Sequence, residues 1–195
     1  MNNFFKHPTI LYVIKFIGIF CLLYYGTKAM IAFAAPGGKL YIPFVRHYLD
    51  YVSWIKISLM RVPGLILSAF GIGTHIEPGF VLRVNGGRGV IIAYSCVGYG
   101  VYSFWIAFVA ANKGKIWKKI RWIVMGVLAL WFINVIRITL FLLAINKGWP
   151  MPLGIDHHTW FNIFAYLLIF LMIVWYDRSF KNKSGNSLPA VPTAK

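Results

Sequence analysis

The chain has 195 residues, of which 59% are hydrophobic and 18% aromatic, and its mean hydropathy is +0.70. Only 12% of the residues are charged, compared with about a quarter in soluble domains. The sequence has twenty Lys and Arg residues but only four acidic ones. This composition excludes an ordinary soluble domain. It also argues against a nucleic-acid-binding protein, because the basic residues lie at the ends of apolar runs.

The first two apolar runs differ in character. Residues 9–35 exceed the roughly 20 residues that cross a bilayer, lack a cleavage pattern and are predicted to form a signal-anchor span. Residues 51–72 are also apolar, but three residues interrupt them: Lys56, Arg61 and Pro63. This second run is therefore predicted to be a spanning, a re-entrant or an interfacial helix.

A polar segment with a different period follows these runs. Residues 80–94 read as strand, turn and strand, and Asn85-Gly86 supplies the positive φ of a tight turn. We predict an external β-hairpin here. A phosphate-binding loop is disfavoured, because no helix N-terminus follows the glycines in the required way.

Three further spans are predicted, over residues 97–111, 120–145 and 157–176. The loop of residues 112–121 carries five Lys and Arg residues, the strongest basic cluster of the sequence, and is assigned to the cytoplasmic side. Residues 177–195 are predicted to form a disordered cytoplasmic tail.

Together these segments predict one integral membrane domain over residues 1–195, with an all-α polytopic fold. The fold contains four to five transmembrane helices, one interfacial or re-entrant helix and the short external β-hairpin. With the basic loop inside, the outer ends of three spans meet on one face, and they carry Cys96, Arg137 and the His157-His158 pair.

Arg137 is the most costly residue of the sequence, because a mid-span arginine opposes membrane insertion by roughly 2.5–3.5 kcal/mol. One interpretation is structural, with the guanidinium bound to backbone carbonyls or to a lipid phosphate. The other is a fixed positive charge that favours a thiolate or stabilises an oxyanion. Asn134 lies three residues earlier on the same helical face and is suited to orient this guanidinium.

Cys96 and two histidines complete a candidate catalytic set. Cys96 lies where the hairpin ends and a span begins, whereas Cys21 lies mid-span and is interpreted as an apolar filler. A histidine beside a thiolate acts as a general base and then as an acid for a leaving amine. His158 shares a helical face with Asn162, whereas His157 opens the helix, so the choice between the two histidines stays open.

Three motifs in this order resemble the exosortase/archaeosortase family: Cys96-Val97-Gly98, Asn134-Val135-Ile136-Arg137 and Asp156-His157-His158. Members of that family are polytopic membrane transpeptidases with an invariant Cys, Arg and His. This sequence departs from the pattern at Val97, where the family typically carries Ser or Thr, and it has fewer spans than many members. The resemblance covers roughly residues 80–176.

The resemblance implies both the residues and the reaction. The catalytic residues would be Cys96, Arg137 and one of the two candidates His157 and His158, and the supporting residues Gly98, Asn134 and Asn162. The enzyme would be a cysteine peptidase/transpeptidase that cleaves C-terminal sorting signals of exported proteins through a thioester, at the outer face of the bacterial inner membrane. Its partners would be the sorting-signal helix and the lipid bilayer. No cofactor, metal ion or nucleic acid is expected.

Two other functions remain open on the residues alone. The chain could be a non-enzymatic membrane subunit or a small transporter that uses Arg137 as an anion site, and an inert thiol at Cys96 would favour that reading. A lipid-handling enzyme fits the arginine and the histidines but gives Cys96 no task.

Overall fold

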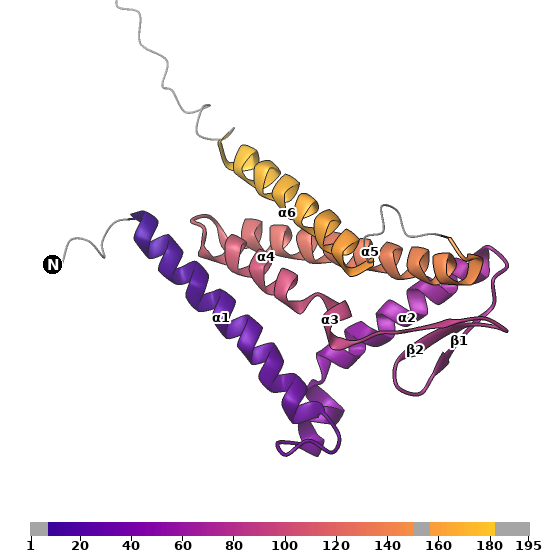
Figure 1. Cartoon of the computed structure of the whole chain (residues 1–195). Coiled ribbons are helices and arrows are strands. Elements are labelled where there is room, and N and C mark those ends of the chain that lie inside the picture. Colours follow the sequence, from indigo (N-terminus) through magenta and orange to yellow (C-terminus); the bar gives the residue numbers. More distant parts are fainter. Residues whose placement is uncertain (1–7, 150–156, 182–195) are drawn as a thin grey trace, which may run out of the picture.

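The computed structural model describes residues 8–149 and 157–181. Its helices are α1 (Pro8–Ala34), the π-helical turn η2 (Val45–Leu49), α2 (Tyr51–Ala69), α3 (Tyr94–Val97), α4 (Tyr99–Ala111), α5 (Ile116–Lys147) and α6 (His157–Lys181). Its strands are β1 (Thr74–Glu77), β2 (Val81–Val84) and β3 (Gly89–Ile91). Within these described ranges, five helical segments are long and apolar enough to cross a membrane. The protein is a polytopic, mostly helical membrane bundle with a small sheet, as predicted (Figure 1).

Helices α1 and α4 pack antiparallel (Figure 1). Phe16 meets Phe104 edge-on with ring centroids 5.4 Å apart, and Tyr24 meets Tyr99 at 5.3 Å. Residue numbers therefore rise along α1 as they fall along α4. The first turn of α1 lies toward the end of α4 that leads into the basic segment, and the last turns of α1 lie at the opposite end.

Helix α2 begins at that opposite end. Thr27 Oγ1 and Tyr51 Oη lie 2.6 Å apart, which joins the later part of α1 to the first residue of α2. Asp50 caps α2, because its carboxylate accepts a hydrogen bond from the backbone N–H of Ser53 at 3.0 Å. The start of α2 is thus fixed at the end of the bundle where α4 begins.

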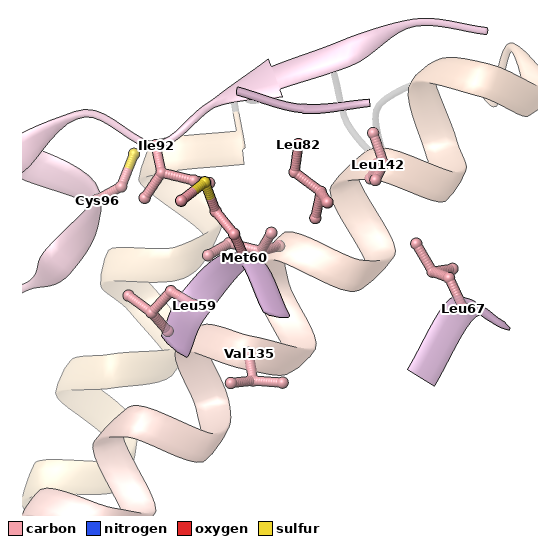
Figure 2. Close-up of a cluster of buried hydrophobic side chains, with 9 residues drawn as sticks. Leu59, Met60, Leu67, Leu82, Ile92, Cys96, Val135 and Leu142 are labelled. Atoms are coloured by element: carbon pink, nitrogen blue, oxygen red, sulfur yellow. The ribbon is translucent and has the colours of Figure 1, made fainter. Parts of the chain in front are cut away.

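From there α2 runs beside the later part of α5. Figure 2 shows Leu59 toward Val135 and Leu67 on the side of Leu142, and all four residues belong to one buried cluster. Because numbers rise together along the two helices, α2 runs parallel to this part of α5 and away from the basic segment.

Helix α5 joins two hydrophobic cores. Its first half packs with α4 and α6 around Trp105 and Met172, whereas its second half packs with α2, α3 and the sheet around Leu82 and Ile138. The second core contains Cys96, so the candidate nucleophile belongs to the packing of α2 and the sheet as well as to that of α5.

The ends of α5 and α6 differ from the predictions. The segment 112–121 is not a loop throughout, and the span predicted at 120–145 is longer, because α5 begins at Ile116 and ends at Lys147. Lysine and arginine are good helix formers whose charged tips can reach the lipid headgroups, so a basic segment need not end a helix. The tail predicted at 177–195 is wrong for its first residues, since α6 continues to Lys181, and residues 182–195 lie outside the described part.

Residues 80–94 contribute two strands to a three-stranded antiparallel sheet, of which the first strand, β1, was not predicted. Strand β2 pairs with β1 from Val84↔Thr74 to Val81↔Glu77 and with β3 on its other edge. At the turn, Gly86 has a φ of +72°. The sheet is attached to the end of α5 by the Asn146 amide, which accepts a hydrogen bond from the Arg88 N–H at 2.7 Å and donates to the Arg88 carbonyl at 3.1 Å.

Candidate active site

Cys96 lies in α3, a single helical turn between the sheet and α4. Gly98 follows α3 with a φ of +76°, a conformation that side chains disfavour, and this residue separates α3 from α4. The span predicted at 97–111 is therefore α4 preceded by a distinct turn. The Cys96 side chain is 4% exposed and lies at the edge of the buried cluster, next to Ile92 (Figure 2).

Asn134 holds this turn against α5. Its Nδ2 donates to the carbonyl oxygen of Cys96 at 2.6 Å and, more weakly, to that of Val97 at 3.4 Å. Both hydrogen bonds use the amide nitrogen of Asn134, whereas orienting the Arg137 guanidinium, which only donates, would use Oδ1, so that role stays a prediction. Asn134 is 1% exposed, and its Oδ1 accepts no hydrogen bond from any residue that the structure describes.

Arg137 lies on α5 about one turn beyond Asn134 and is half-buried. Its neighbours Val135 and Ile138 are fully buried in the same cluster as Cys96. The helix therefore brings the guanidinium-bearing turn to the end of the bundle where Cys96 lies.

Helix α6 runs antiparallel to α5. The ring of Trp122, near the start of α5, meets those of Trp175 and Tyr176 at 5.0 and 5.3 Å, so the last turns of α6 lie at the basic end. The first turn of α6, which begins at His157, is accordingly directed toward the opposite end. Asp156 and the side chains of His157 and His158 lie outside what the structure describes.

A pocket of about 460 Å³ lies between α1, α4 and α6. Two of the predicted supporting residues, Gly98 and Asn162, line it together with Ser95 and with aromatic residues that include Tyr166. Ser95 is exposed there, whereas the next residue, Cys96, packs into the cluster of α2 and α5. A ligand in this pocket would lie within one residue of the thiol.

A buried lysine, which the sequence analysis treated only as an interruption of an apolar run, belongs to the same region. Lys56 on α2 is 4% exposed, and its Nζ lies 3.6 Å from the centroid of the Phe80 ring and 4.2 Å from that of Tyr94. Cys96 follows Tyr94 by two residues and acts electrostatically on Lys56. The reasoning that singled out Arg137, namely the cost of a charge in an apolar run, applied equally to Lys56 and could have found it.

Asp50 and Arg46 extend this charged group. Arg46 Nη1 lies 2.6 Å from Asp50 Oδ2 and donates to Ser53 Oγ at 3.0 Å. Asp50 is 3% exposed, so the carboxylate of this ion pair is buried. Both residues act electrostatically on Lys56.

Comparison with known proteins gives one clear result. Residues 4–179 match the family described as transmembrane exosortase, and this match covers most of the sequence. Searches among curated proteins and among solved structures found no match. The family match includes Cys96, Asn134 and Arg137 and extends over all described helices except the last residues of α6. The chain belongs to the transmembrane exosortase family.

Proposed function

We propose that this protein is a cysteine peptidase/transpeptidase that cleaves C-terminal sorting signals of exported proteins at the outer membrane face. Family membership supports a membrane transpeptidase-type function in general terms, and the site argues for the finer steps. The observation that carries the proposal is the buried 2.6 Å bond from Asn134 to the Cys96 carbonyl. This bond ties the only thiol near the sheet to the helix that bears Arg137.

In the first step, the Cys96 thiolate attacks the carbonyl carbon of the substrate peptide bond, and a C–S bond forms. Negative charge develops on the carbonyl oxygen, and the Arg137 guanidinium stabilises it. The C–N bond then breaks, and the leaving amine takes a proton from the imidazolium of His157 or His158. The products are a thioester on Cys96 and the released C-terminal segment.

In the second step, an acceptor amine or water attacks the thioester carbon. The histidine, now neutral, takes the proton of the attacking group, and the C–S bond breaks to restore the Cys96 thiolate. Transfer to an amine makes a new amide, whereas attack by water gives a carboxylate. The electron pair returns to sulfur in both cases, so no redox partner is required.

The pocket between α1, α4 and α6 supports a place for the substrate. A sorting signal with an apolar helix can lie against the aromatic residues of this pocket, of which Tyr166 is exposed. Its scissile bond would then be near Ser95 and Gly98, at the turn that carries the nucleophile. On this basis we assign substrate entry to the side of α1 and α6, and not to the side of α2.

Co-expression with an exported protein that ends in a short motif, an apolar helix and a basic tail tests the proposal. Cys96→Ala is expected to abolish processing of that protein, whereas Cys21→Ala, the matched change at the other cysteine, is expected to leave processing intact. Mass spectrometry of the processed protein identifies the cleaved bond and the acceptor. Continued processing by Cys96→Ala at equal membrane abundance would rule out the thioester mechanism.

A further inference from the structure

Lys56 is a buried lysine to which the described residues offer no hydrogen bond. Among the described residues it contacts two aromatic rings, Phe80 and Tyr94, and forms neither a hydrogen bond nor a salt bridge. Aromatic faces attract a cation by roughly 0.5–2 kcal/mol each, which is less than the cost of removing an ammonium group from water. Burial to 4% exposure favours the neutral form of Lys56, and a nearby anion favours the charged form.

The charges around Lys56 are unbalanced when Cys96 is a neutral thiol. Burial is the largest influence on Lys56 and favours its neutral form, Asp50 and Cys96 act the other way and favour its charged form, and Arg46 opposes the charged form. Asp50 is already paired with Arg46 at 2.6 Å, so this pair is nearly neutral as a whole. Of the groups in the described part of the chain that act on Lys56, the sulfur of Cys96 is the other one that can supply a negative charge.

We propose that Lys56 is a positioning residue that stabilises the thiolate of Cys96. The inference rests on the proposed function for its purpose, since a peptidase needs the thiolate, but the pairing itself requires no substrate. The rings of Phe80 and Tyr94 hold the ammonium at the approach to α3. A cation held beside a buried thiol favours the thiolate over the neutral thiol.

Arg137 on α5 and Tyr94 on α3 are the other ionisable groups to consider. Tyr94 presents its ring to Lys56. Arg137 is unchanged in every Lys56 variant, so its contribution to the thiolate is the same in all of them. The role of Lys56 can therefore be measured with Arg137 in place.

The test is the pH dependence of alkylation of Cys96 by iodoacetamide, in the full-length protein with Cys21→Ala so that one thiol remains. Burial scales the rate at every pH, whereas the ionisation of the thiol sets the pH of half-maximal rate. In Lys56→Met this pH is expected to rise by about one unit or more, as for loss of an adjacent opposite charge. Lys56→Arg is expected to restore it at least in part.

Lys28→Met is the matched control. Lys28 also lies over aromatic rings, 5.7 Å from the centroid of Tyr24 and 6.0 Å from that of Tyr25, but it is exposed on α1. Its replacement is expected to leave the alkylation profile unchanged. An equal shift in both variants, or none in Lys56→Met, would overturn the proposal.

A second variant covers the case in which Lys56→Met does not fold. Asp50→Asn keeps a capping oxygen for α2 but removes the charge that neutralises Arg46. The two cations then face Cys96 alone, and the pH of half-maximal alkylation is expected to fall. An unchanged or higher value would contradict the charge balance on which the proposal stands.

These readouts separate the inference from the proposed function. A shifted alkylation profile in Lys56→Met together with continued processing by Cys96→Ala would support the Lys56–Cys96 interaction and refute the peptidase function. Loss of processing in Cys96→Ala with no shift in Lys56→Met would support the peptidase function and refute the Lys56–Cys96 interaction.

Discussion

The carbonyl oxygen of Cys96 has a buried partner on another helix, the Asn134 amide at 2.6 Å. Asn134→Ala leaves that carbonyl unsatisfied at a cost of about 1–3 kcal/mol, which loosens α3. We expect faster labelling of Cys96 by a bulky maleimide at a fixed pH, measured in the Cys21→Ala background. Asn146→Ala is the matched control, because this amide binds the Arg88 backbone at the far end of α5. Equal labelling rates in the two variants would show that Asn134 does not restrain the turn.

Arg137 is expected to require its guanidinium and not merely its charge. The planar group offers five donors in a fixed geometry, whereas lysine offers a compact ammonium of different reach. Arg137→Lys should therefore lose nearly all processing activity, on the order of 100-fold or more, as for removal of one oxyanion donor. Processing near the wild-type rate, at equal membrane abundance on an immunoblot, would assign Arg137 a structural role.

Some of these residues could be predicted from the sequence and others could not, for physical reasons. Cys96 and Arg137 stood out because a thiol at a span boundary and a charge inside a span are unusual. Asn134 was singled out for its spacing from Arg137, but its real partner is 38 residues away, and such a contact exists only after folding. Lys56 was not singled out because its aromatic neighbour Phe80 lies in the turn between β1 and β2, which no local pattern places beside α2.

Helices α4 and α5 approach so closely at Gly126 that no side chain fits. A Cβ atom there would collide with the indole of Trp105 and the terminal methyl of Met172. Gly126→Ala is expected to destabilise the protein by about 1–3 kcal/mol, seen as a lower unfolding temperature in detergent. Gly18→Ala on α1 is the control, because its Cβ meets nothing within 4 Å, and it should be neutral or stabilising by about 0.5–1 kcal/mol. A lower unfolding temperature for Gly18→Ala than for Gly126→Ala would contradict this packing.

Between strands β1 and β2, an ion pair should make the sheet sensitive to acid. The hydrogen bond from Arg83 Nε to Glu77 Oε1, at 2.6 Å, lowers the pKa of Glu77 below its usual 4.5. A carboxyl group with a lowered pKa stabilises the fold above its unfolded pKa, and this contribution is lost as the pH falls through the lower folded value. Amide exchange in β1 and β2 should accelerate in that acidic window. The neutral variant Glu77→Gln should show no such step there, and an identical step in both proteins would assign it to another group.

At the scale of elements, the apolar runs were enough to locate the long helices but not the sheet or the helix ends. Strand β1 reads Thr-His-Ile-Glu, which is too short and polar to suggest a strand, and it is ordered by pairing with β2. The division of α3 from α4 depends on one backbone angle at Gly98. Local sequence permits that angle without requiring it.

The arrangement of the whole bundle predicts its orientation in the membrane. The antiparallel packing of α1 on α4 places the start of α1 at the same end as the basic residues of α5, which we expect to face the cytoplasm. With native cysteines replaced, Lys115→Cys should react with a membrane-impermeant maleimide only after permeabilisation. Lys39→Cys, just beyond α1, should react in intact cells. Labelling of Lys115→Cys in intact cells would place the proposed site on the cytoplasmic side and contradict this orientation.

The same arrangement bears on α2, whose sequence left three possibilities. Tyr51 is joined to Thr27 at the end opposite the basic residues, and α2 then runs parallel to the later part of α5. With the start of α1 inside, α2 begins outside and does not return across the bundle. We therefore favour an interfacial or re-entrant α2, although its 19 residues have the length and composition of a span.

Helix α5 has 32 residues and is therefore about 48 Å long, well beyond the roughly 30 Å of hydrocarbon in a typical bilayer. Even at a tilt of about 40°, the upper end of the usual range, it would still rise about 37 Å. Asn134 lies 18 residues beyond Ile116, which is about 27 Å along the helix and about 21 Å in depth at that tilt, so an inner end anchored by its lysines brings this residue into the outer half of the bilayer. On the proposed orientation, hydrophobic mismatch bears on the depth of Cys96: lipids with longer acyl chains would draw the thiol deeper below the outer surface and limit the access of water to the proposed thioester.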